Sequence, residues 1–306
     1  MNDKLQILES VLGSGEKTNR DYYQFHCPFC SHRKKKLGIS LGTGKWKCWV
    51  CPAKGSNVSI LFRKLNQSQS KVQQVKELWK EKVYFKTEPL TTLQLPKEFK
   101  PLWEPSGSFF YKKAQGYVKK RGITEGDIIK HHIGYCEQGQ YNDKVIFPSY
   151  TEQGQLNFFG SRTFNELSNY KFKIPENIDK NEIVFDENLI NWQEPVILVE
   201  SKLDAIVIKR NAYPLYGKGI NKALQQKVLE EGTSEIIFCL DGDALNDAIL
   251  QAEWFLNNGI TVKKVRLPEN EDPNSLGYKE VWKYIKKAEP LNESEIWLFK
   301  IKNKLK

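Results

Sequence analysis

Two short apolar runs that each end in an acid constrain the fold of this chain most strongly. Glu200 follows the run Pro195–Val199, and Asp241-Gly242-Asp243 follows the run Ile236–Leu240. Both runs are too short for core helices and are rich in β-branched residues, so they predict buried parallel strands. A helical spacing of apolar residues comes after each acid. The order strand, acid, helix therefore occurs twice, which is typical of an α/β domain with a mostly parallel sheet.

These acids lie where an open α/β sheet binds its ligands, in the crevice outside the carboxyl ends of the strands. Glu200, Asp241 and Asp243 would repel one another there unless a cation lay between them, and carboxylate oxygens suit Mg²⁺ or Mn²⁺. Three solvated loop acids are the alternative, because Asp-Gly-Asp also occurs in turns and in calcium loops. The helical pattern after each acid favours the metal site.

Three segments resemble the signatures of the Toprim domain, which DnaG-type primases, topoisomerases and some nucleases share: VILVESKLDAI, IIFCLDGDALNDA and VRLPENEDPNSLG. The resemblance implies a magnesium or manganese site held by Glu200, Asp204, Asp241, Asp243 and Asp272. Among these, Glu200 would act as general acid/base or position the metal, and Asp241 and Asp243 would be the main ligands. Asn274 departs from the family, which usually has a further aspartate there, so a third metal position would be weaker.

Four cysteines form two hooks, Cys27-Pro28-Phe29-Cys30 and Cys48-Trp49-Val50-Cys51. Two such hooks, separated by a loop of this length, have the spacing of a closed, structural Zn²⁺ site. Two disulfides or four core cysteines are the alternatives. No secretory segment precedes the hooks, and no apolar run approaches the roughly 18 residues of a membrane span. We therefore expect a reducing cytoplasm, that of a bacterium or of an infected host.

Cations and aromatic side chains alternate around the hooks: Arg33-Lys34-Lys35-Lys36, Lys45, Lys47 and Lys54 among Tyr22, Tyr23, Phe25, Trp46 and Trp49. A surface of this composition tracks phosphates and stacks exposed bases, although each aromatic ring could instead pack around the metal. The stretch from Trp46 to Phe62 resembles the zinc-binding module at the N-terminus of DnaG-type and phage primases, where it helps to choose the template start site.

A basic segment lies between the hooks and the acids. Asp143–Pro148 and Leu156–Arg162 are predicted strands, joined by a turn that contains glycine. This segment is similar to the basic half of the DnaG-type RNA polymerase core. The resemblance implies that five cations hold template phosphates or the incoming nucleoside triphosphate: Arg121, Lys144, Arg162, Lys171 and Lys173. Surface salt bridges are the alternative for each of them.

The 306-residue chain is long enough for two or three domains. We expect a zinc ribbon (1–65), a helical and proline-punctuated linker (66–105), a basic α+β subdomain (106–190), a Toprim domain (191–290) and a basic C-terminal helix or tail (291–306). The formal net charge of +10, from 47 Lys and Arg against 37 Asp and Glu, agrees with a polyanionic partner.

The whole pattern resembles a DnaG-type DNA primase, most of all the replicative primases of bacteriophages. The resemblance implies metal-dependent synthesis of short RNA primers from ribonucleoside triphosphates on a single-stranded DNA template. A RecR-like recombination and repair factor also places a zinc module before Toprim, but it has no need of the basic segment. A Toprim nuclease would share the metal chemistry. A topoisomerase would need a further domain with a tyrosine nucleophile.

No helicase motor is visible and few residues follow the Toprim signatures, so we expect a separately encoded replicative helicase as partner, and no membrane partner. Trp297, Ile301 and Leu305 recur every four residues in the tail. This spacing predicts a helix whose apolar face either contacts the helicase or packs on its own domain.

Overall fold

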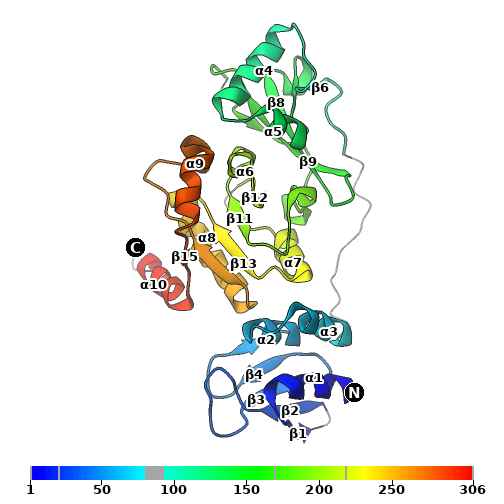
Figure 1. Ribbon diagram of the computed structural model, residues 1–306, viewed down its shortest axis with the longest axis vertical. Helices are drawn as coiled ribbons and strands as arrows, with labels where there is room; N and C mark the ends of the chain where they lie inside the picture. Colours follow the sequence, from blue (N-terminus) through cyan, green and yellow to red (C-terminus); the bar gives the residue numbers. More distant parts are fainter. Residues whose placement is uncertain (1, 20, 80–92, 169, 218, 305–306) are drawn as a thin grey trace. The chain divides into compact units, whose positions relative to one another are not determined.

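The computed structural model describes residues 2–19, 21–79, 93–168, 170–217 and 219–304 (Figure 1). The chain divides into two compact units, one of residues 1–85 and 253–261 and the other of residues 86–252 and 262–306. Within the described residues, one five-stranded sheet lies in the first unit and two lie in the second.

The sheet of the first unit is antiparallel and its strands follow chain order: β1 (Glu16–Asn19), β2 (Tyr22–Phe25), β3 (Leu37–Ser40), β4 (Trp46–Cys48) and β5 (Lys54–Gly55). Its helices are α1 (Asn2–Leu12), α2 (Val58–Lys64) and α3 (Gln69–Trp79). Along β4, Trp46 and Cys48 are buried whereas Lys47 is exposed. One face of the sheet therefore packs into the core, and the other remains accessible.

Helix α3 lies in the segment that the sequence predicts as a linker. Val72, Val75 and Trp79 lie on one side of this helix at helical spacing and are buried in the same core cluster as Phe25 and Trp46. This helix is thus part of the first unit. The sequence predicts a helix near Val72 to Val83, and the part of it beyond Trp79 lies outside the described residues.

The first sheet of the second unit is antiparallel, in the order β10-β9-β8-β7-β6. Its strands are β6 (Phe99–Pro101), β7 (Gly134–Cys136), β8 (Lys144–Tyr150), β9 (Leu156–Thr163) and β10 (Phe172–Lys173). Val145 and Phe147 of β8 pack in a core cluster with Val118 of α4 (Phe109–Lys120) and Ile128 of α5 (Glu125–Lys130). The predicted hairpin of two strands, β8 and β9, is confirmed.

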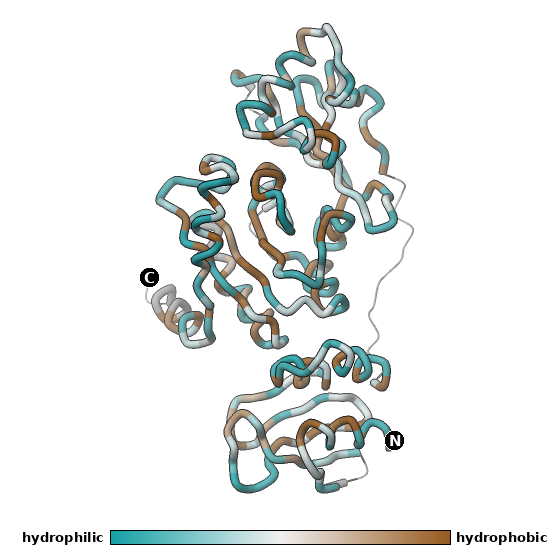
Figure 2. Tube along the Cα trace, viewed as in Figure 1, coloured by the Kyte–Doolittle hydropathy of each residue, from teal (hydrophilic) through white to brown (hydrophobic). Residues whose placement is uncertain are grey.

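The second sheet of this unit has the order β12-β11-β13-β14-β15. Its strands are β11 (Val196–Val199), β12 (Ala212–Pro214), β13 (Glu235–Phe238), β14 (Thr261–Lys264) and β15 (Glu289–Pro290). Strand β11 is parallel to both of its neighbours, β12 and β13, and β15 runs antiparallel to β14. Figure 2 shows hydrophobic residues concentrated along the central strands. The predicted α/β class with a mostly parallel sheet is confirmed.

Five helices accompany this sheet in the described residues: α6 (Lys202–Ile208), α7 (Lys222–Glu231), α8 (Gly242–Asn257), α9 (Pro273–Ile285) and α10 (Glu293–Lys304). In helix α10, Ile296 is buried at 1% exposure whereas Trp297 is 65% exposed, so Trp297 does not pack in the core of its own domain. Leu305 lies outside the described residues. In the described part of the chain, no helix has both the length and the apolar content needed to cross a membrane.

Candidate functional site

The two predicted catalytic loops lie side by side at one edge of the parallel sheet. Glu200 directly follows β11, and Asp241 lies between β13 and α8. Strands β11 and β13 are parallel neighbours in the sheet. Both acids line one cavity of about 180 Å³, together with Asp204 and Asp272. Asp243 belongs to the first turn of α8, and its side chain is not among those described. The arrangement follows from the topology, since parallel strands end at the same edge.

Asp204 is held by its own loop and by helix α9. Its Oδ2 accepts hydrogen bonds from the Ser201 backbone N–H at 3.1 Å and from the Ser201 hydroxyl at 2.6 Å, which closes a capping box on α6. Its Oδ1 accepts the backbone N–H of Asn274 at 3.1 Å. Burial, with the charge of Asp272 adding to it, raises the pKa of Asp204 to about 6. Both oxygens of Asp204 therefore fix the loop that carries Glu200.

Asp272 caps the next helix. Its Oδ1 accepts the backbone N–H of Ser275 at 2.6 Å, and Pro273 occupies the first position of α9. Asp272 remains partly exposed and lines the acidic cavity. It thus presents carboxylate oxygen to the cavity from a rigid helix end.

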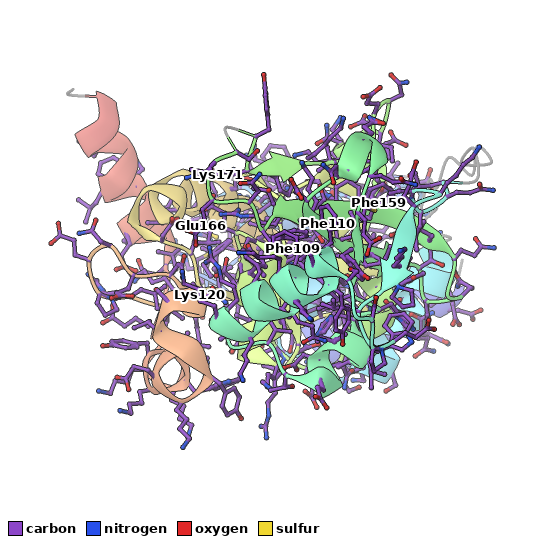
Figure 3. All side chains as sticks on the ribbon, turned by 90° about the horizontal axis from the view of Figure 1, so that it is seen from above. Phe109, Phe110, Lys120, Phe159, Glu166 and Lys171 are labelled. Carbon is purple, nitrogen blue, oxygen red and sulfur yellow. The ribbon has the colours of Figure 1, made fainter. Side chains whose placement is uncertain are left out.

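A second cavity, of about 440 Å³, continues from the acidic one and is basic. Arg121, Arg162 and Asn274 line both cavities. Lys120 and Lys171 line the basic cavity but not the acidic one. Glu166 lies between these two lysines in Figure 3, and its carboxylate is 3.5 Å from Lys120 Nζ. Carboxylates and cations thus adjoin in one continuous groove.

A third cavity, of about 300 Å³, adjoins the acids on their other side and has aromatic walls. Phe147, Phe172 and Tyr216 line it, and it shares Arg162 and Glu200 with the acidic cavity. A Cβ atom on Gly160 would lie 2.7 Å from the Tyr216 ring, so only glycine lets this ring lie against β9.

The structure brings three of the five predicted cations together and separates the other two. Arg121, Arg162 and Lys171 line the basic cavity. Lys144 is buried, and its Nζ donates to the backbone carbonyl of Asn142 at 3.3 Å. Lys173 lies 3.8 Å from a Glu176 oxygen.

Strand register explains the separation. Val145 pairs with Arg162 and lies in the core between the sheet and its helices, so the adjacent Lys144 points to the opposite face. Phe172 likewise pairs with Arg162, which places Lys173 on the face opposite to the cavity.

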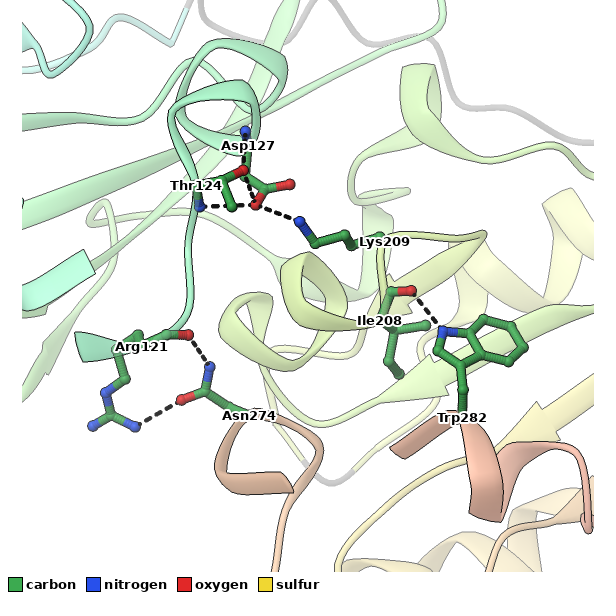
Figure 4. A network of polar contacts seen from close by, with 7 residues as sticks. All are labelled: Arg121, Thr124, Asp127, Ile208, Lys209, Asn274 and Trp282. Atoms are coloured by element: carbon green, nitrogen blue, oxygen red, sulfur yellow. Dashed lines mark hydrogen bonds and ion pairs between the residues drawn. The ribbon is translucent and has the colours of Figure 1, made fainter. Parts of the chain in front are cut away.

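Polar contacts join the part of the chain around the antiparallel sheet of the second unit to the part around its mostly parallel sheet (Figure 4). Asp127, in the capping box of α5, accepts a hydrogen bond from Lys209, the residue that follows α6, at 3.0 Å. Burial raises the pKa of Asp127, but the hydrogen bonds from Thr124 and Lys209 outweigh it and hold this pKa below its usual value. The sequence gives no signal for these long-range pairs.

The four predicted zinc ligands come together in the first unit. Cys27 Sγ lies 3.7 Å from Cys51 Sγ, and Cys30 Sγ lies 3.9 Å from Cys48 Sγ. These separations are near the roughly 3.8 Å edge of a tetrahedron with Zn–S bonds of about 2.3 Å, and far above the roughly 2.05 Å of a disulfide. All four cysteines are free.

Among the described residues, these thiols are the one group of potential ligands whose donor atoms lie within 4.8 Å of one another. The chemistry of the four-sulfur set fits structural zinc. His26 is exposed and His32 is half-buried, and the Nδ1 of His32 accepts the backbone N–H of Lys34 at 3.1 Å. Neither histidine belongs to the group of sulfur atoms.

The accessible face of the zinc module combines aromatic and basic side chains. Trp49 is 60% exposed, and Lys47 Nζ lies 4.9 Å from the centre of its ring. A Cβ atom on Gly38 would lie 2.8 Å from the Tyr22 ring and 3.2 Å from Trp49 Nε1, so glycine makes room for both rings. Lys54 pairs with Lys47 in the next strand. By contrast, Phe25 and Trp46 of the predicted aromatic set are buried in the core.

No family model matches the chain. The DNA primases of Legionella pneumophila and Pasteurella multocida are 22% and 23% identical to it over 307 and 356 residues. The matches cover 82% and 91% of this chain but only 52% and 59% of the two relatives. The chain thus spans a little over half the length of these curated relatives.

Solved structures of primases share the fold. The zinc-binding and RNA polymerase domains of Aquifex aeolicus primase match with a TM-score of 0.52 at 19% identity, over 94% of this chain and 84% of that one. A DnaG primase catalytic domain bound to single-stranded DNA matches with a TM-score of 0.52 at 20% identity, over 60% of this chain and 76% of that one. The chain therefore has the fold of the zinc-binding and RNA polymerase domains of DnaG-type primases.

Proposed function

We propose that this chain is a DNA primase, which joins ribonucleotides into short RNA primers on a single-stranded DNA template. One observation carries the proposal: the acidic cavity at the end of the parallel sheet shares Arg121 and Arg162 with the adjoining basic cavity. Such a groove offers oxygen ligands for a cation beside positive charge for phosphates, which is what template-directed nucleotidyl transfer requires.

Glu200, Asp241, Asp243 and Asp272 would hold Mg²⁺ or Mn²⁺. The donor set fits, because hard carboxylate oxygens from three loops line a single cavity. When bound, the cations would neutralise triphosphate charge and favour the deprotonated primer 3′-hydroxyl in an in-line displacement. Asp204 would instead keep the loop of Glu200 in place, since its two oxygens already accept hydrogen bonds within the protein.

Three cations would bind the polyanionic substrates. Arg121 and Arg162 lie at the junction of the acidic and basic cavities, where a guanidinium group can grip a phosphate through two parallel hydrogen bonds. Lys171 would bind a phosphate further along the basic cavity. Lys144 and Lys173 have structural partners, and any template contact of theirs would use the other face of the sheet.

The zinc module would hold the template. Its exposed Trp49 and the lysines of the same face offer stacking to bases and charge to phosphates, the combination that binds single strands. Zinc would be structural, because a closed four-thiolate shell leaves no position for a catalytic water.

A separately encoded replicative helicase would be the partner that delivers unwound template. Trp297 and Leu298 of α10 are 65% and 54% exposed and offer an apolar contact for it. Trp297→Ala should then lose helicase stimulation while basal priming stays unchanged. If the helicase stimulates the wild-type chain and the Trp297→Ala variant equally, this contact is excluded.

The function is tested by incubating the chain with single-stranded DNA, Mg²⁺ and labelled ribonucleoside triphosphates. A primase produces short labelled RNA. A Toprim nuclease would shorten the DNA without incorporating label, and a RecR-like factor would bind DNA without either reaction. The basic cavity beside the acids favours the primase, because a DNA clamp has no use for a nucleotide-binding groove.

A further inference from the structure

Asn274 makes three hydrogen bonds that link the two halves of the candidate site (Figure 4). Its side-chain Oδ1 accepts a hydrogen bond from Arg121 Nη1 at 3.1 Å, and its Nδ2 donates to the backbone carbonyl of Arg121 at 2.9 Å. Its backbone N–H donates to Asp204 Oδ1 at 3.1 Å. One residue at the start of α9 thus contacts both a cation of the basic subdomain and an acid of the Toprim subdomain.

The reciprocal pair of bonds uses both ends of the amide group. Arg121 ends helix α4, where its backbone N–H already bonds to the last turn, and its guanidinium lies 5.6 Å from the Tyr117 ring centre. With Asn274 holding both its carbonyl and its guanidinium, Arg121 is fixed at the junction of the acidic and basic cavities.

We propose that Asn274 is a positioning residue: it holds the Arg121 guanidinium ready for a phosphate, and it does not serve as a ligand of the catalytic cation. The phosphate belongs either to the DNA template or to the ribonucleoside triphosphate. This proposal rests on the primase function proposed above.

In this chain a neutral amide stands where the family that the sequence resembles usually has an aspartate, and the difference in charge changes what the residue can do for Arg121. An aspartate at position 274 would accept a charge-assisted, bidentate pair from Arg121 and so neutralise the cation that must bind phosphate. It would also lose the hydrogen bond to the Arg121 carbonyl, and it would add a negative charge beside Asp204 and Asp272. The neutral amide orients the arginine and leaves its charge available.

Asn274→Asp separates this role from metal ligation because the two roles predict opposite results. If Asn274 were a weak metal ligand, the aspartate would bind Mn²⁺ more tightly and increase synthesis. As a positioning residue, the aspartate should raise the KM for ribonucleotides or the Kd for single-stranded DNA about tenfold or more, whereas Asn274→Ala, which adds no charge to the acidic cavity, should leave Mn²⁺ affinity within about twofold. Mn²⁺ binding is read by electron paramagnetic resonance, and DNA binding by fluorescence anisotropy.

A raised KM for ribonucleotides would show that the phosphate belongs to the triphosphate, and a raised Kd for DNA would show that it belongs to the template. Asn181→Asp is the matched control, because Asn181 is exposed, lines none of the three cavities and receives the same added charge. A thermal melt shows that each variant is folded, and Asn274→Ala removes the contact without adding charge.

A double-mutant cycle tests whether Asn274 acts through Arg121. Asn274→Asp should add little to the effect of Arg121→Gln. Additive effects, unchanged constants in both Asn274 variants, or clearly weaker Mn²⁺ binding by Asn274→Ala would overturn the proposal. DNA and Mn²⁺ binding are measured without primer synthesis, so a chain that makes no primers would fail the proposed function and still test the contact with Arg121.

Discussion

Lys202 and Asp186 form a buried ion pair beneath the candidate site: Lys202 Nζ lies 2.5 Å from Asp186 Oδ1, and both side chains are 3% exposed. Lys202 begins α6, two residues after Glu200. The Asp186 backbone N–H donates to the Ser149 hydroxyl at 2.8 Å, which ties the same loop to β8 of the basic subdomain. The pair therefore connects the helix behind the catalytic loop to the other half of the core.

Lys202→Met should lower the free energy of unfolding by about 3–5 kcal/mol, because it leaves the Asp186 carboxylate buried without its partner. Replacing both residues, as Lys202→Met with Asp186→Asn, should recover most of this loss. Chemical denaturation followed by circular dichroism measures both.

Lys100→Met is the matched control, since Lys100 pairs with Glu137 at 2.6 Å but its side chain is 52% exposed. This control should cost much less stability than Lys202→Met, because solvent screens an exposed ion pair. A Lys202 variant as stable as the control would show that the buried pair contributes no stability.

Asp241→Asn should abolish primer synthesis, by at least about a hundredfold, because it removes a charged oxygen ligand from the acidic cavity. Single-stranded DNA binding should remain within about twofold, since Arg121, Arg162 and Lys171 are untouched. Synthesis is measured by gel electrophoresis of labelled products, and DNA binding by anisotropy. Near-normal synthesis would remove Asp241 from the catalytic set.

Cys48→Ser should lose zinc and unfold the N-terminal zinc module while the second unit stays folded. Binding of structural zinc supplies much of the folding free energy of such small modules, about 10–16 kcal/mol in zinc-finger peptides. Metal analysis gives the zinc content, and limited proteolysis shows which unit is cleaved.

Cys239→Ala is the control for the loss of a thiol, because Cys239 is buried in the core of the second unit, and burial raises its pKa to about 12. This variant should keep its zinc. Wild-type protein without bound zinc would contradict the assignment of the four cysteines.

Trp49→Ala should weaken binding of single-stranded DNA by about 5- to 150-fold, the range expected when one base loses its stacking partner. Trp103→Ala is the control, because Trp103 is 39% exposed but lies in the second unit and lines none of the three cavities. If the two variants bind an oligonucleotide equally well, the zinc module does not stack bases on Trp49.

Local patterns in the sequence predict much of this architecture. The runs before Glu200 and Asp241 are strands, and the cysteine hooks meet, because spacing and periodicity within a few residues determine these features. The sequence also allows the orientation of Lys144 to be predicted. In a strand, Lys144 must point to the face opposite to that of the core residues Val145 and Phe147.

The contacts between distant segments could not be predicted in this way. Arg121 and Asn274 are 153 positions apart, and nothing near either residue indicates the other. The same holds for Lys202 and Asp186. The residues around Lys202 in the sequence do not indicate that its side chain is buried. Tertiary packing decides which charged side chains are buried and paired.

Template-directed synthesis tests the central claim most directly. The chain is incubated with a single-stranded oligonucleotide of defined sequence, Mg²⁺ and four ribonucleoside triphosphates, and the experiment is repeated with each nucleotide left out in turn. The account predicts short RNA complementary to the template, which stops at the first position that needs the missing nucleotide and which the Asp241→Asn protein does not make. No RNA with any template, or RNA whose length and sequence are independent of the template, would contradict it.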